Sequence, residues 1–301
     1  MFLKRICIFL AVAFLVVDVV LLTFYLKARN HLLVISDEMI QNTVMYYESN
    51  GVNIKEDVIE SKIPENAVYT FDHSNIDCSV EIAEKMAKKL FSENSTVSFA
   101  ETPDGISFSL SNKGSIEANF RVYRDSFRFE YLKGDFSKDT VSFLLPSEFE
   151  NKNTVLSNES KKVIDSFLKC ISMKNEHKYV VSGISEISEG TYVCIKSIVN
   201  DKCPLENMYI NFYIKNKELV YADGNWVFSN FKKSYKEQLV DGINVLNRIN
   251  ISAVSTIVSE NIVYMYRGTG SGRYYLIPMW KIEYIDTNGN IKIQYIDAIK
   301  S

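Results

Sequence analysis

This sequence of 301 residues contains few glycine, proline and histidine residues, and neither charge is in large excess. The formal net charge is −3, so no basic surplus is present to neutralise phosphates, and nucleic acid is excluded as a partner. With 12 glycines and 5 prolines, long disordered linkers are not expected. What is abundant is apolar: hydrophobic residues make up 47%, and frequent Phe, Tyr, Ile and Val residues favour strands.

Familiar catalytic signatures are also lacking. The sequence has no G-x-S-x-G pattern, no H-E-x-x-H pattern and no P-loop lysine signature. His31, His73 and His177 lie in polar loops or at element edges, as ordinary surface histidines do. The glycine-rich run at 268–272 is flanked by predicted strands, which favours a hairpin loop over a phosphate-binding loop. We therefore predict that the chain is not an enzyme and holds no cofactor.

Cysteine is present but not in metal-binding patterns. Cys7 lies in the apolar N-terminal segment, and the other four have neither C-x-x-C spacing nor a histidine at ligand spacing, so no metal site is predicted. Two disulfides could form if this region is exported, whereas buried free thiols are the simpler interpretation. The cysteines that the sequence leaves open in this way are Cys78, Cys170, Cys194 and Cys203.

One long hydrophobic run dominates the N-terminus. Residues 6–26 contain a single charge, Asp18, and as a helix they would span the ~30 Å hydrocarbon core at about 1.5 Å per residue. The run is longer than the core of a cleaved signal peptide, and no cleavage site follows it. We predict an uncleaved single-pass anchor in the cell membrane, with a cytoplasmic N-terminus and extracytoplasmic C-terminal domains.

The acid within this run calls for an explanation. An Asp at the centre of a membrane helix costs about 2.5–3.5 kcal/mol on the insertion scale, which the surrounding apolar residues outweigh. We expect its face to pack on another transmembrane helix that satisfies the carboxyl group; the alternative is a protonated Asp tolerated in lipid. At helical spacing, this predicted transmembrane interaction face consists of Ala11, Phe14, Leu15, Asp18, Leu22 and Tyr25.

Beyond the anchor, hydrophobic periodicity predicts an alternation of helices and strands. Helices with apolar i, i+3, i+4 faces are expected at 36–49, 79–91, 159–172, 236–249 and, more briefly, 251–259. Alternating strands are expected at 96–100, 106–110, 116–124, 127–131, 178–187, 191–199, 208–215, 218–223, 262–266, 274–285 and 291–296.

This order of a helix followed by a strand meander occurs twice. It predicts an α+β protein in which an N-terminal transmembrane helix is followed by two tandem helix-plus-antiparallel-sheet domains. The expected boundaries are 1–30 for the cytoplasmic stub and anchor, 31–150 for the first domain and 151–301 for the second.

The two ends of the chain are similar to a known family. The opening run IFLAVAFLVVDVVLLTFYL resembles the anchor of the YycH/YycI-type regulators, particularly the YycI type. Near the C-terminus, DGINVLN followed by LIPMW resembles their terminal module, in which a helix precedes a strand with a Leu-x-Pro-x-Trp motif. A last strand ending in YIDA completes the similarity.

The resemblance implies PepSY-like domains and a membrane-anchored accessory protein of an essential cell-wall two-component system in Gram-positive bacteria. Such a protein is not an enzyme; it binds and modulates a sensor histidine kinase through transmembrane and extracytoplasmic contacts, and can also bind a sister regulator. The alternatives are a cell-envelope enzyme or ligand-binding protein, which needs a cleft with convergent polar groups, and a PepSY-like peptidase inhibitor.

Overall fold

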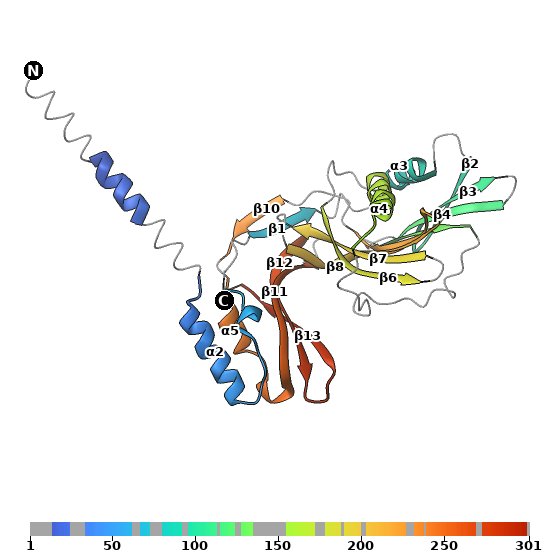
Figure 1. The fold of residues 1–301 in the computed structure, drawn as a ribbon. Helices are drawn as coiled ribbons and strands as arrows, with labels where there is room; N and C mark the ends of the chain where they lie inside the picture. Colours follow the sequence, from blue (N-terminus) through green and yellow to red (C-terminus); the bar gives the residue numbers. More distant parts are fainter. Residues whose placement is uncertain are drawn as a thin grey trace, which may run out of the picture. The chain divides into compact units, whose positions relative to one another are not determined.

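A computed structural model of the chain forms two compact units, and unit 1 is assembled from three separate stretches of sequence (Figure 1). Unit 1 comprises Met1–Asn66, Lys236–Ile262 and Met279–Ser301, and unit 2 comprises Ala67–Tyr235 and Val263–Pro278. The structure describes residues 14–24, 34–61, 67–72, 80–91, 96–112, 115–123, 128–134, 155–171, 178–187, 190–199, 203–226, 232–237, 239–268 and 273–299.

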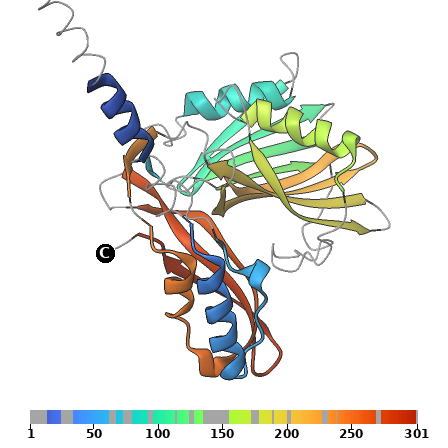
Figure 2. The same cartoon turned by 60° about the vertical axis from the view of Figure 1, so that its left-hand side comes forward.

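Unit 1 places two helices on one face of a small sheet (Figure 2). Strand β13 pairs antiparallel with β12, from Met279↔Asp297 to Ile285↔Ile291. Strands β11 and β12 each have one end in unit 1 and the other in unit 2. The elements of unit 1 are α2 (Asp37–Ser49), η1 (Glu56–Val58), α5 (Gly242–Leu246), η5 (Ile251–Ala253), β11 (Val254–Gly268), β12 (Arg273–Asp286) and β13 (Ile291–Asp297).

Helix α2 forms as its capping residue predicts. The hydroxyl of Ser36 accepts a hydrogen bond from the backbone N–H of Met39 at 3.3 Å, which satisfies one of the unpaired donors of the first turn. Ile40 and Tyr47 on its inner face are buried. Opposite them, Trp280 of β12 is fully buried, and its indole N–H donates to the carbonyl of Val240 at 2.9 Å.

In unit 2, two long amphipathic helices lie over one face of an antiparallel sheet (Figures 1 and 2). Helix α3 (Val80–Phe91) and helix α4 (Asn158–Ile171) bury their apolar faces against strand residues such as Phe120, Phe129 and Phe212. The strands are β1 (Ala67–Asp72), β2 (Thr96–Thr102), β3 (Gly105–Asn112), β4 (Ser115–Tyr123), β5 (Arg128–Lys133), β6 (Tyr179–Ile187), β7 (Gly190–Val199), β8 (Cys203–Lys215), β9 (Glu218–Asn225) and β10 (Lys232–Lys236).

The predicted fold class is wrong. The protein is mostly sheet, and its strands join in one 13-stranded sheet. Ten of them follow the order β10-β1-β12-β11-β8-β9-β5-β4-β3-β2. Of the other three, β13 pairs with β12, β7 pairs with β8, and β6 pairs with β7. The sheet is mixed, because β8 and β11 run parallel where Leu205 faces Tyr264. Two separate antiparallel sheets were expected because local alternation identifies strands but says nothing of which distant strand each one pairs with.

The predicted transmembrane anchor is also wrong. Among the residues that the structure describes, no helix has both the length and the apolar character to cross a membrane. The described part of the predicted anchor is a helix over residues 14–24. This finding contradicts the predicted single-pass membrane protein with a signal anchor. It also contradicts the predicted localisation, with a cytoplasmic N-terminus and extracytoplasmic domains.

The helix predicted over 236–249 is largely replaced by other structure. Residues up to Lys236 belong to strand β10, and the helix starts only at Gly242, after Asp241 has capped it by accepting from the N–H of Asn244 at 2.9 Å. Instead of a helical turn, Leu239 forms an isolated β-bridge with Ile299. The short helix predicted over 251–259 is reduced to η5, after which β11 begins at Val254.

Candidate functional site

A cavity of about 610 Å³ opens in unit 1 beside the start of α2, η1 and the middle of β11. Its polar lining combines acidic residues with Gln41, Ser61 and Asn261, and no Lys, Arg or His among the described residues contributes to it. Ile40, Val58 and Ile59 add apolar walls. The carboxylate residues of the lining are Asp37, Glu56, Asp57, Glu60 and Glu260.

Glu260 differs from the other acids because it is only 3% exposed. It follows the period of β11 that also points Ile262 and Tyr264 inward, and both of these are buried. Its Oε2 accepts a hydrogen bond from the backbone N–H of Glu60 at 3.2 Å. Its Oε1 is buried without a hydrogen-bond partner among the described residues, an arrangement that is costly unless something else satisfies that oxygen.

The surroundings of Glu260 favour its neutral form. Burial raises the pKa of its carboxyl to about 8; the backbone N–H of Glu60 opposes this, and the negative charges of Glu60 and Asp241 add to it. Tyr47 of α2 is fully buried and its hydroxyl also has no partner among the described residues. Burial, together with Tyr46 and Glu260, raises the pKa of Tyr47 to about 12.

Gly242, the first residue of α5, leaves the space that the carboxyl group occupies. A Cβ at this position would lie 2.6 Å from Oε2 and 2.8 Å from Oε1 of Glu260. The carboxyl group is therefore packed closely against α5, and Glu260 also contributes to the lining of the cavity. The arrangement can accept hydrogen bonds and compensate a positive charge.

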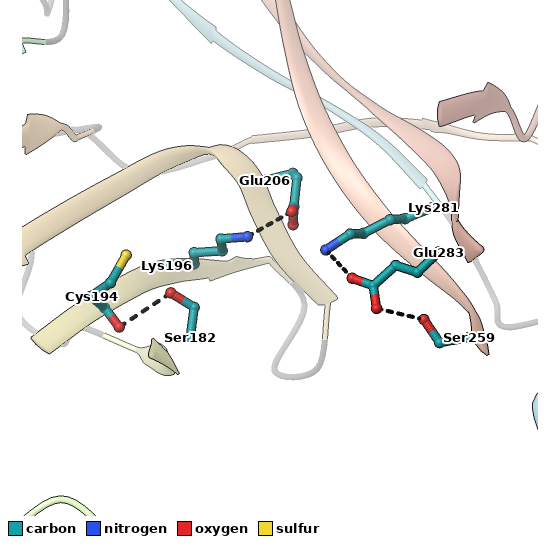
Figure 3. A network of polar contacts seen from close by, with 7 residues as sticks. All are labelled: Ser182, Cys194, Lys196, Glu206, Ser259, Lys281 and Glu283. Carbon is teal, nitrogen blue, oxygen red and sulfur yellow. Dashed lines mark hydrogen bonds and ion pairs between the residues drawn. The ribbon is translucent and has the colours of Figure 1, made fainter. Parts of the chain in front are cut away.

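Other polar clusters are already paired (Figure 3). In unit 2, the Lys196 ammonium lies 2.6 Å from Glu206, with side chains only 12% and 9% exposed. In unit 1, Lys281 lies 2.9 Å from Glu283, which also accepts from the Ser259 hydroxyl at 3.0 Å. Each cation is matched by an adjacent carboxylate, so these clusters are ordinary partly buried ion pairs.

Among the described residues, no disulfide forms, and the cysteines concerned are Cys170, Cys194 and Cys203. Burial raises the pKa of the Cys194 thiol to about 11, and that of Cys170 is also raised by burial. Both thiols are therefore protonated at neutral pH, which makes them poor nucleophiles. The Ser182 hydroxyl donates to the carbonyl of Cys194 at 3.2 Å. Cys78 lies outside the described residues.

An apolar groove of about 350 Å³ in unit 2 is lined by α4, including Ser166 and Cys170, and by Leu90, Tyr131 and Leu219. Ser166 and Lys169 have the S-x-x-K spacing found in some serine hydrolases. Both residues are exposed on α4, and a lysine that acts as a base at neutral pH needs burial. This pair does not form a catalytic arrangement.

Strand β13 is the second notable surface of unit 1. Within the described residues it pairs with β12 alone, so its other edge faces outward. Ile291 and Ile293 lie on one face of this strand and are 75% and 41% exposed. Large apolar side chains in a row beside a strand edge are unusual in a protein that works alone.

The predicted transmembrane interaction face falls on the helix over residues 14–24. Phe14, Leu15, Asp18 and Leu22 are on this helix, and all four are exposed. Ala11 and Tyr25 lie outside the described residues. The role predicted for this face is not tested by the described residues and stays a prediction.

Similarity to known proteins is confined to solved structures. No family model and no curated protein matches the chain. An uncharacterized protein from Eubacterium rectale ATCC 33656 is similar with a TM-score of 0.50 and 13% identity, covering 83% of this chain and 88% of that one. At this identity the likeness shows the fold alone.

The Bacillus megaterium YpeB C-terminal domain is also similar, with a TM-score of 0.41 and 8% identity over 74% of this chain and 93% of that domain. A YycH/YycI assignment, and with it the two-component and kinase-regulator description, has no support in these comparisons.

Proposed function

We propose that this chain is a non-enzymatic binding protein that takes up an extended segment of another protein along strand β13. The observation that carries the proposal is the outward edge of β13 beside two exposed isoleucines. An unpaired strand edge offers backbone N–H and C=O groups that an incoming strand can complete, and the neighbouring side chains then set specificity.

The side chains on this part of the sheet suit such a partner. Ile291 pairs with Ile285 of β12, and Ile293 pairs with Glu283, so the exposed face is apolar at its outer end and charged farther in. Covering the two isoleucines removes apolar surface from water at roughly 25 cal/mol per Å².

The identity of the bound protein is a prediction. The resemblance implies a sensor histidine kinase or a sister regulator, and either would have to supply a segment able to add to β13. The first experiment is photo-crosslinking in cells that make the chain, with benzoyl-phenylalanine in place of the exposed Lys292. We expect an adduct with one protein, which is then purified and titrated against the chain by calorimetry.

The double variant Ile291→Lys/Ile293→Lys should weaken that binding about tenfold or more, since charges on a strand edge oppose pairing. Val258→Lys is the matched control, because it makes the same change at an exposed position of β11. The proposal fails if the purified pair binds the double variant as tightly as the control, or if irradiation joins the chain to no protein.

A further inference from the structure

We propose that the cavity around Glu260 is a binding site for an organic ammonium ion carried on an aliphatic chain. The site lies on the helix-covered side of unit 1 and is independent of strand β13. Neither the resemblance nor the similar structures assign a ligand to it.

The charge of the lining selects a cation. Asp37, Glu56, Asp57 and Glu60 are exposed around the mouth, and no basic residue of the described ranges is part of the lining. Negative charges gathered at the mouth of a cavity attract a positively charged ligand. These acids alone could still be a solvated surface, so the decisive observation lies deeper.

That observation is the buried oxygen of Glu260. Glu260 is 3% exposed, keeps one carboxyl oxygen without a partner among the described residues, and lines this same cavity. Gly242 closes off its other side, since even a methyl group there would overlap the carboxyl. Oε1 exposes less than 1 Å², so an N–H donor that enters the cavity satisfies it after the covering side chains shift, while Oε2 keeps its bond to the Glu60 N–H.

The same geometry favours an amine over a metal ion. Among the described residues, no group of three or more His, Cys, Asp or Glu side chains is arranged to hold a metal. Ile40, Val58 and Ile59 line the cavity, and they suit the methylene groups of an aliphatic chain. An ammonium group at the end of that chain supplies three donors for the acid.

Binding should release a proton. Among the described residues, the groups that act on Glu260 are Tyr47 of α2, Glu60 after η1 and Asp241 before α5, and none of them is cationic; burial raises the pKa of Glu260 to about 8. An ammonium ion beside the carboxyl lowers that pKa and stabilises the ionised form. Affinity should therefore rise about tenfold per pH unit up to about pH 8 and then level off.

The test is calorimetric titration of the full chain at pH 6, 7 and 8, in buffers with different ionisation heats. The probes are 1,4-diaminobutane, the lysine side-chain mimic N-acetyl-lysine methylamide, and tetramethylammonium, a cation without N–H donors. We expect the first two to bind with release of about one proton at pH 6, and tetramethylammonium to bind at least about tenfold more weakly. Tighter binding of the diamine indicates a free amine as ligand, and tighter binding of the mimic indicates a partner's lysine.

Two variants isolate the acid from its surroundings. Glu260→Gln keeps the shape and neutrality of the protonated acid, and it should lose both the affinity and the proton release. Asp57→Asn at the mouth of the cavity should weaken binding a fewfold but keep the pH dependence. If Glu260→Gln folds poorly, this second variant tests the proposal in its place. The proposal is overturned if neither amine binds at pH 8, if tetramethylammonium binds equally well, or if proton release does not occur.

Discussion

A single carboxyl group, that of Glu260, combines burial, proximity to two other acids and an oxygen without a protein partner. Its folded-state pKa of about 8 lies well above the ~4.3 of an unfolded glutamate. Between these values the folded protein holds a proton that the unfolded chain has released, so the free energy of unfolding falls as pH rises. The loss is on the order of 5 kcal/mol at most, complete above about pH 8.

Urea unfolding at pH 5, 6.5 and 8 measures this effect, with Glu260→Gln as the comparison. The stability of wild type relative to the variant should decline across the series, because only the wild type has the titrating group. Glu186→Gln, an exposed acid on β6, serves as the control and should run parallel to the wild type. A constant difference between wild type and Glu260→Gln would contradict the prediction.

Sequence reasoning missed Glu260, although a signal was present. The alternation of β11 places it in phase with Ile262 and Tyr264, and an acid at an inward strand position is a conspicuous exception. The strand was predicted only from residue 262 onward, so the acid fell into a supposed helix. The residues that complete the site come from distant segments, and no local pattern brings Glu60 and Asp241 together.

At the scale of elements, the β8–β9 hairpin shows how a turn stores strain. Its two turn residues, Asn216 and Lys217, have φ angles of +51° and +66°, the left-handed conformation that a two-residue hairpin requires. A non-glycine residue there costs about 1 kcal/mol. Lys217 also pairs with Glu159 at 2.7 Å, but such an exposed pair contributes little.

Lys217→Gly should therefore stabilise the protein by about 0.5–1 kcal/mol, measured by urea unfolding. Lys217→Ala is the matched control: it removes the same ion pair but keeps the Cβ, so it should be neutral or slightly destabilising. The interpretation of the turn is wrong if the glycine variant is no more stable than the alanine variant.

Elements with strong local signals were predicted well. Helices α2, α3 and α4 lie within a residue or two of their predicted positions, because caps and apolar periodicity agree there. The failures occur where tertiary pairing overrides periodicity. Leu239 and Ile243 have helical spacing, yet Leu239 bridges to Ile299 and a helix starts only after Asp241. The parallel pairing of β8 with β11 depends on residues almost sixty positions apart.

For the whole molecule, the two tryptophans provide one reporter in each unit. Trp226 belongs to unit 2 and Trp280 to unit 1, and both are buried. Because β11 and β12 run without interruption from one unit into the other, we expect the units to unfold together. Each of the variants Trp226→Phe and Trp280→Phe keeps one tryptophan. In each variant, the urea midpoint measured by fluorescence should equal the urea midpoint measured by circular dichroism.

A midpoint by fluorescence that departs from the circular-dichroism midpoint of the same variant would show that the units unfold separately. The comparison is made within each variant, since either substitution lowers stability by itself. Tyr192→Phe, a partly buried change that leaves both tryptophans in place, controls for the effect of altering an aromatic residue.

The interleaving of the units also bears on how the protein is made. A ribosome delivers the helix α2 of unit 1 first and strand β13 last, with almost all of unit 2 emerging in between. Translation adds about 5–20 residues per second, so ten seconds or more pass between the synthesis of α2 and the synthesis of the strands that cover its apolar face. Ile40 and Tyr47 are then open to chaperones and to wrong partners for the whole of that interval. Nascent chains that stall before residue 279 should accordingly be the ones on which chaperones accumulate.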